Sequence, residues 1–166
     1  MDVITTHTNA DFDCLGAMTA ALRLYPGALP AFSGSQEKGV RDFVERHPEY
    51  LPNFIRAKDI DLLSITRLII VDCQQAARIG RFAEILGNPS LEIHIYDHHP
   101  VTEVSIVPTG GLLGVCGSAS TLLVSRLMAE GVSLAPEEAT LILLGIHEDT
   151  GRLLRDIPEA LLSRSM

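Results

Sequence analysis

Several acidic and imidazole side chains of this chain stand where strand-like segments end. They are His7, Asp11, Asp13, Asp72, Asp97, His98, His99 and Asp149. Carboxylates that converge on one point repel one another unless cations neutralise them. A mixture of carboxylate and imidazole ligands is typical of sites for Mn²⁺, Mg²⁺ or Fe²⁺, whereas zinc sites are often rich in thiolates. These residue types therefore predict a metal centre, in which two ions about 3.5–4 Å apart would clamp a phosphate.

Asp72 is the natural bridging ligand of such a centre. It follows the run Arg67–Val71, whose side chains are nearly all β-branched or leucine, as is typical of a central parallel strand. Ligands of open α/β sheets bind beyond the carboxyl ends of the strands. In the loop after the first expected strand, Asp11 and Asp13 are two positions apart and can project to the same side, with His7 close by.

Each of these features also has a structural explanation when it is taken alone. A single Asp after a strand is often only the cap of the next helix, and Asp149–Gly151 fits a simple helix C-terminal turn. His94 and His147 fit hydrogen-bonded structural histidines, and His47 fits a surface position. The metal centre is favoured by the conjunction of four separate segments that each break at an acid.

The elements that must position these residues alternate between short apolar strands and helices. We expect strands at residues 2–6, 29–32, 67–71, 91–95 and near 104–107. We expect helices at residues 16–25, after 33–36, at 76–86, 117–130 and 137–148. This alternation predicts an α/β fold with a mainly parallel sheet of about five strands flanked by helices.

Composition limits the range of functions. The chain has 166 residues, of which 46% are hydrophobic and 20% are charged, which predicts one globular domain. The net charge of −8 argues against a long nucleic-acid surface, but allows a short anionic substrate held through metal ions. The distant cysteines Cys14, Cys73 and Cys116 predict reduced thiols and a cytoplasmic location. No segment has the pattern of a signal peptide or a membrane span.

Four segments resemble the motifs of the DHH phosphoesterase superfamily, in the same order. They are His7–Asp13, Val71–Asp72, Asp97–His99 and Gly145–Gly151. That superfamily includes RecJ-type exonucleases, oligoribonucleases, cyclic-dinucleotide phosphodiesterases, exopolyphosphatases and manganese pyrophosphatases. More narrowly, residues 4–16 and 32–38 resemble the N-terminal DHH module of bacterial proteins that also carry CBS domains and a tRNA nucleotidyltransferase, or poly(A) polymerase, region.

The resemblance implies a domain of the DHH N-terminal type and a hydrolase with two divalent cations. Mn²⁺ is the first choice, with Mg²⁺ or Co²⁺ as alternatives. One ion would be held by His7 and Asp11, and Asp72 would bridge to the other. The implied ligands of the second ion are Asp13, His98 and Asp149.

The resemblance also implies roles for residues that contact the substrate. His99 would face the phosphate as an acid or charge stabiliser, Asp97 would orient an imidazole, and Asn9 would contact the phosphate or steady its loop. The segment 117–121 reads as a helix N-terminus, which is either an anion site or an ordinary serine cap. The predicted substrate-binding residues there are Ser118, Ser120 and Thr121.

The implied reaction is hydrolysis of a phosphodiester or phosphoanhydride bond in a short nucleotide or oligonucleotide. We expect residues 1–151 to form the DHH domain and 152–166 a tail or the start of a linker. The second, substrate-gripping domain of the superfamily, often marked by a glycine-rich run that ends in histidine, is not in this sequence. The chain would then be a fragment or a stand-alone module, with a homodimer as a further possibility. Alternatives are a metal- or nucleotide-binding regulatory module of a larger protein, or a polyphosphate or pyrophosphate hydrolase.

Overall fold

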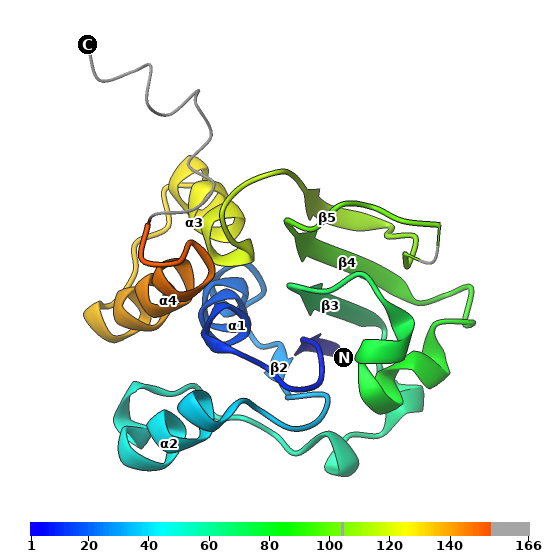
Figure 1. The fold of residues 1–166 in the computed structure, drawn as a ribbon. Coiled ribbons are helices and arrows are strands. Elements are labelled where there is room, and N and C mark those ends of the chain that lie inside the picture. The colour runs from blue at the N-terminus through cyan, green and yellow to red at the C-terminus, as the bar shows by residue number, and fades with distance from the viewer. Residues whose placement is uncertain (104, 154–166) are drawn as a thin grey trace.

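A computed structural model, which describes residues 1–103 and 105–153, contains one five-stranded sheet (Figure 1). The strands are β1 (Asp2–Thr5), β2 (Leu29–Pro30), β3 (Arg67–Val71), β4 (Glu92–Asp97) and β5 (Gly110–Leu113). Their order is β2-β1-β3-β4-β5, and every neighbouring pair is parallel. The predicted α/β class is confirmed.

Different elements cover the two faces of the sheet. The α-helices are α1 (Phe12–Leu24), α2 (Lys38–Arg46), α3 (Ala119–Ala129) and α4 (Pro136–Asp149). Helices α1, α3 and α4 pack together beside one face, as Figure 1 shows. Short 3₁₀ turns cover the other face or connect elements, at Pro48–Tyr50, Ala57–Asp59, Leu62–Ser64, Ala76–Arg78 and Gly80–Ile85. None of the described helices has both the length and the hydropathy that a membrane crossing needs.

The central strand β3 explains why the sheet has two cores. Leu68 and Ile70 belong to the apolar cluster under the 3₁₀ turns, whereas Ile69 and Val71 belong to the cluster under the helices. All four side chains are fully buried. A strand that is covered on both faces must be apolar at every position, and this requirement produced the continuous run in the sequence.

The strand order places the candidate site. From β1 the chain crosses to β2 on one side, whereas β3 lies on the other side of β1. The connections therefore diverge between β1 and β3, and the crevice at such a switch point is where open α/β sheets bind ligands. The loop after β1 carries His7, Asp11 and Asp13, and Asp72 follows β3 directly.

The predicted helix at 76–86 is wrong, because this stretch forms two 3₁₀ turns instead. Gly80 separates them with a positive φ of 54°, and a Cβ at this position would lie 2.4 Å from the backbone oxygen of Ser33. The close approach of the loop after β2 therefore interrupts the helix. Helix α1 begins at Phe12, before the predicted position 16, because the Asp11 side chain caps it.

The last strand also differs from the prediction. It lies at Gly110–Leu113 and not near 104–107, where residue 104 is outside the described residues and Ser105 forms only an isolated antiparallel bridge. A Cβ at Gly110 would lie 2.7 Å from the His94 ring, and Gly111 has φ 102°. The strand thus needs glycines, which strand propensity disfavours. The predicted tail at 152–166 lies outside the described residues from 154 onward.

Glycines allow the three helices beside the sheet to approach closely. A Cβ at Gly145 of α4 would lie 2.8 Å from the backbone oxygen of Phe12 and 2.8 Å from Ser120 Oγ. A Cβ at Gly16 of α1 would lie 2.8 Å from the same Ser120 Oγ. This contact brings the start of α1, the start of α3 and the end of α4 to one point, where the candidate site lies.

We expect Gly145→Val to destabilise the protein by about 1–3 kcal/mol, because the added carbons meet backbone atoms that have little room to move. Urea unfolding followed by circular dichroism measures this loss. Gly87→Val is the matched control, since nothing lies within 4 Å of a Cβ at Gly87. Equal stability of the two variants would contradict the close helix contact.

Candidate metal centre

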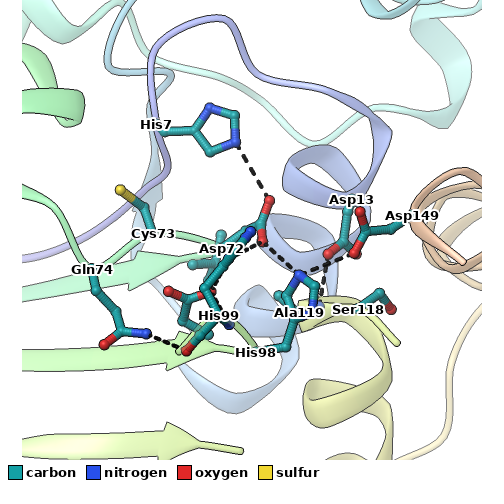
Figure 2. Close-up of polar contacts among 12 residues, drawn as sticks. His7, Asp13, Asp72, Cys73, Gln74, His98, His99, Ser118, Ala119 and Asp149 are labelled. Atoms are coloured by element: carbon teal, nitrogen blue, oxygen red, sulfur yellow. Dashed lines mark hydrogen bonds and ion pairs between the residues drawn. The ribbon is translucent and has the colours of Figure 1, made fainter. Parts of the chain in front are cut away.

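Asp72 lies at the middle of the site, between two imidazoles (Figure 2). Its Oδ2 is 3.5 Å from His7 Nε2 and its Oδ1 is 3.5 Å from His98 Nε2. The residue is 97% buried and has a φ of 55°, in the left-handed region that few non-glycine residues adopt. Such a backbone costs of order 1–3 kcal/mol and is typical of functional sites. The strained turn after β3 therefore aims a buried carboxylate between two histidines.

The first group of donor atoms surrounds one oxygen of Asp72. His7 Nε2 lies 3.9 Å from Asp11 Oδ2, and donor atoms of His7, Asp11, Cys14 and Asp72 all lie within 4.8 Å of one another. His7 Nδ1 is 2.8 Å from the backbone oxygen of Thr8. A carbonyl oxygen only accepts, so Nδ1 carries a proton, and in the neutral ring Nε2 presents its lone pair to this group.

The second group lies on the other side of Asp72. Donor atoms of Asp13, His98 and Asp149 lie within 4.8 Å of one another, and His98 Nε2 is 3.0 Å from Asp149 Oδ2. His98 Nδ1 donates to the backbone oxygen of Cys116 at 3.0 Å. Its Nε2 therefore also presents a lone pair to the carboxylates when the ring is neutral. The structure brings all six predicted metal ligands into these two adjacent groups, while their role as ligands stays a prediction.

Asp13 is anchored by the N-terminus of α3. Its carboxylate accepts the backbone N–H groups of Ala119 at 2.7 Å and Ser120 at 3.0 Å. Ser118 caps the same helix, because its Oγ accepts the backbone N–H of Thr121 at 3.1 Å. The anion at this helix terminus is therefore the protein's own carboxylate. Ser118 and Ser120 are fully buried, and the substrate-binding role of Ser118, Ser120 and Thr121 stays a prediction.

His99 stands at the rim, oriented by Asp97. The buried Asp97 Oδ1 accepts from His99 Nδ1 at 2.7 Å and from the His99 backbone N–H at 3.2 Å. This hydrogen bond raises the pKa of His99 above its usual value. Gln74 also donates to the backbone oxygen of His99 at 2.9 Å, as Figure 2 shows. The His99 side chain is half exposed, so a fixed imidazole faces the opening of the site.

Asn9 lies in the exposed part of the loop after β1. It has a φ of 62°, and its amide donates to Glu37 Oε1 at 3.2 Å. Asparagine tolerates this left-handed backbone better than most residues. The contact is one that steadies the loop, and a contact with phosphate stays a prediction.

Without cations, protons balance the charges of the site. Burial and the charge of Asp72 raise the pKa of Asp13 to about 7. Burial opposes charge on His98, but its contacts with Asp149 and Asp72 outweigh this effect and raise its pKa to about 11. Burial likewise opposes charge on Asp72, yet the two histidines lower its pKa to about 2. Buried negative charge is therefore present in excess, and the protein compensates with bound protons.

The unpaired atoms fit a divalent cation. Among the described residues, three buried atoms at the centre lack an aligned hydrogen-bond partner: Asp72 Oδ1, His98 Nε2 and Asp149 Oδ2. Buried polar atoms in proteins are nearly always paired, so atoms that converge without partners point to a ligand. Carboxylate oxygens and imidazole nitrogens are donors that Mn²⁺, Fe²⁺ and Co²⁺ accept. Fold and site together define a doubly wound α/β domain with a carboxylate–imidazole cluster at its switch point.

Sequence comparison identifies the family. The DHH family, N-terminal domain, matches residues 3–146, and the chain belongs to this family. An A-adding tRNA nucleotidyltransferase of Geobacter sulfurreducens is 56% identical over 153 residues, and one of Aquifex aeolicus is 31% identical over 154 residues. These matches cover 92% and 90% of this chain, but the chain spans only 17% of the length of each relative. The predicted resemblance to the DHH superfamily and its link to tRNA nucleotidyltransferases are confirmed.

A solved structure supports the fold. An exopolyphosphatase-related protein from Bacteroides fragilis superposes with a TM-score of 0.73 at 16% sequence identity. The match covers 98% of this chain and 50% of that protein. At this identity the likeness concerns the fold alone.

Two groups at the site were missed by reasoning from the sequence. The backbone oxygen of Cys116 orients His98, and the sequence carries no signal for a backbone contact between distant segments. The sulfur of Cys14 lies 3.2 Å from His7 Nε2. Cys14 is three positions after Asp11 at the start of a helix, so helical spacing would have placed both residues on one side. The three cysteines served only to predict reduced thiols and a cytoplasmic location.

We expect Mn²⁺ to raise the melting temperature of the metal-free chain, and to do so more as the pH rises from about 5 to about 8. The pKa of Asp13 is about 7 when folded, against about 3.9 for an unfolded aspartate. The stability that Asp13 contributes to the metal-free protein is therefore present below the pKa of the unfolded state and is lost as the pH rises towards 7. Over the same range, protons compete less with the cation for the Asp13 carboxylate. Thermal unfolding in EDTA and in Mn²⁺ across this pH range measures both the metal-free stability and the increase that Mn²⁺ causes. A Mn²⁺ effect independent of pH would contradict the assignment of Asp13.

We expect Ser118→Ala to cost about 1 kcal/mol of stability, because the cap of α3 is lost. If Ser118 is only a cap, KM for a phosphodiester substrate stays unchanged. A raised KM in a variant that remains folded would instead support the predicted contact with substrate. Urea unfolding and steady-state kinetics on the same preparation separate these outcomes.

Proposed function

We propose that this domain hydrolyses a phosphodiester or phosphoanhydride bond of a short nucleotide or oligonucleotide with two divalent cations. The observation that carries the proposal is the position of Asp72, whose two oxygens face two separate groups of carboxylate and imidazole donors. Membership of the DHH phosphoesterase family supports the same class of reaction.

The residues divide into two halves around Asp72. We assign His7 and Asp11 to one cation, with Mn²⁺ as first choice for the centre and Mg²⁺ or Co²⁺ as alternatives. We assign Asp13, His98 and Asp149 to the other cation. When bound, such a pair of ions activates water and neutralises charge on the phosphate. The protein supplies fixed donor atoms, because each imidazole is held through its Nδ1 by a backbone oxygen.

His99 is the proposed catalytic acid or charge stabiliser. Its Nδ1 is held by Asp97, which leaves Nε2 as the atom that can meet a phosphate oxygen or leaving group. The raised pKa of His99 favours the protonated ring near neutral pH. A protonated imidazole at the rim can stabilise charge on the phosphate or give its proton to the leaving oxygen.

A neighbouring pocket supports a substrate that contains a nucleotide. It has a volume of about 390 Å³, and its lining includes Phe32, Phe54, Arg56 and Lys58. Aromatic rings and cationic side chains are the groups that proteins use to bind bases and phosphates. A Cβ at Gly34, in the pocket lining, would lie 2.7 Å from the side chain of Thr8, the residue after His7. The relatives' name, A-adding tRNA nucleotidyltransferase, also favours a nucleotide over inorganic polyphosphate.

We expect the isolated chain to hydrolyse bis-p-nitrophenyl phosphate and short oligonucleotides in the presence of Mn²⁺ and not in EDTA. Asp72→Ala, prepared in parallel, is expected to reduce the rate to that of the metal-free sample, because the shared carboxylate is lost. Release of nitrophenol and of mononucleotides measures turnover. Activity that survives in Asp72→Ala would contradict the bridging assignment.

A regulatory role in a longer protein is the second candidate. It is favoured by the length of the relatives, of which this chain spans only 17%. We propose residues 1–151 as the DHH domain, with the substrate-gripping domain outside this sequence. Cation binding without turnover by the isolated chain would favour this candidate over a catalytic unit that works alone.

A further inference from the structure

The thiol of Cys14 lies inside the first ligand group. Its sulfur is 3.2 Å from His7 Nε2 and 3.5 Å from Asp72 Oδ2, and the residue is fully buried. It belongs to the same set of donor atoms as His7, Asp11 and Asp72. Neither the family match nor the ligand roles proposed above give this sulfur a function.

The spacing of these atoms fits donors around one ion. With bonds of about 2.0–2.3 Å and tetrahedral angles, neighbouring nitrogen, oxygen and sulfur donors lie about 3.3–3.6 Å apart. The observed separations from His7 Nε2 are 3.2 Å to the sulfur, 3.5 Å to Asp72 Oδ2 and 3.9 Å to Asp11 Oδ2. The distances of the sulfur therefore fit a direct ligand of the ion and not a group that only contacts a ligand.

Burial and the charges of Asp72 and Asp11 raise the pKa of the Cys14 thiol in the metal-free protein, so a bound cation would have to displace its proton. Cys14 lies in the first turn of α1, where the helix dipole favours negative charge. The buried hydroxyl of Thr6 lies 2.8 Å from the sulfur and can donate to it. The Asp72 carboxylate is 97% buried, and it is its Oδ2 that faces the sulfur, whereas the unpaired Oδ1 faces His98. An ion in this group would therefore meet the thiol and one oxygen of a carboxylate whose other oxygen faces the second group.

We propose that Cys14 is a ligand of the first metal ion and gives this position a preference for ions such as Co²⁺, Zn²⁺ or Fe²⁺, so that Mn²⁺ remains the first choice for the second position alone. The inference rests on the proposed metal centre and names the ion that one half of it selects. On binding, the sulfur–metal bond replaces the S–H bond, and the thiol proton passes to the solvent. Soft thiolate ligands favour these ions, whereas carboxylates and water suit Mn²⁺ and Mg²⁺.

The second ligand group has a different composition. It offers the carboxylates of Asp13 and Asp149 with the imidazole of His98, and no thiol is among these donors. The two positions would consequently select different ions, and a site loaded with one metal of each kind becomes the expected resting form.

Titration of the metal-free protein with Co²⁺ tests the proposal. We expect a sulfur-to-cobalt charge-transfer band in the near ultraviolet, which is lost in Cys14→Ala and Cys14→Ser. The double variant Cys73→Ala, Cys116→Ala is the matched control, because it removes the other two thiols and is expected to keep the band. We also expect Cys14→Ala to lower the affinity for Co²⁺ by about 10- to 100-fold and that for Mn²⁺ less.

The outcomes separate this inference from the proposed function. Visible cobalt bands without a charge-transfer band would show that ions bind while Cys14 is no ligand, which overturns the inference alone. Absence of any Co²⁺ or Mn²⁺ binding by calorimetry would overturn the metal centre itself. If the Cys14 variants do not fold, the double variant decides: with Cys14 as its single thiol, a band supports the proposal and its absence overturns it.

Discussion

The excess of buried negative charge around Asp72 is the constraint on which the site depends. Four carboxylates and two imidazoles meet where the helix layer contacts the end of the sheet, and the carboxylates of Asp13 and Asp72 are almost completely buried. An arrangement of this kind is costly unless positive charge compensates it. In the metal-free protein, protons provide this charge, as the raised pKa values of Asp13 and His98 indicate. Divalent cations would provide it by taking the carboxylate and imidazole lone pairs that the protons occupy.

The side chains of the site are held in place more by contacts with the backbone than by contacts with other side chains. Carbonyl oxygens of Thr8 and Cys116 orient the two imidazoles, and amides of α3 hold Asp13. Backbone groups change little when neighbouring side chains are substituted, so a substitution at the rim would leave the donor atoms in place.

Much of the fold could be predicted from the sequence, because its strongest signals are local. Strand β3 was predicted with its exact bounds, since a strand covered on both faces is apolar throughout. Strand β5 was missed because its glycines reflect the close approach of His94 and Ile95, which no local pattern reveals. The candidate ligands were recognisable by type and by their place after strands. For Cys14 the sequence offers only its helical spacing from Asp11, because the contacts of its sulfur with His7 and Asp72 arise in the folded chain.

The span of the ligand set has a consequence for how the protein is made. The donor groups begin at His7, in the loop after the first strand, and end at Asp149, the last residue of α4. A ribosome delivers the chain from its N-terminus, so the first group lacks its shared Asp72 until the sheet forms, and the second lacks Asp149 until the final helix emerges. The proposed second cation could therefore bind only after Asp149 has joined the folded domain.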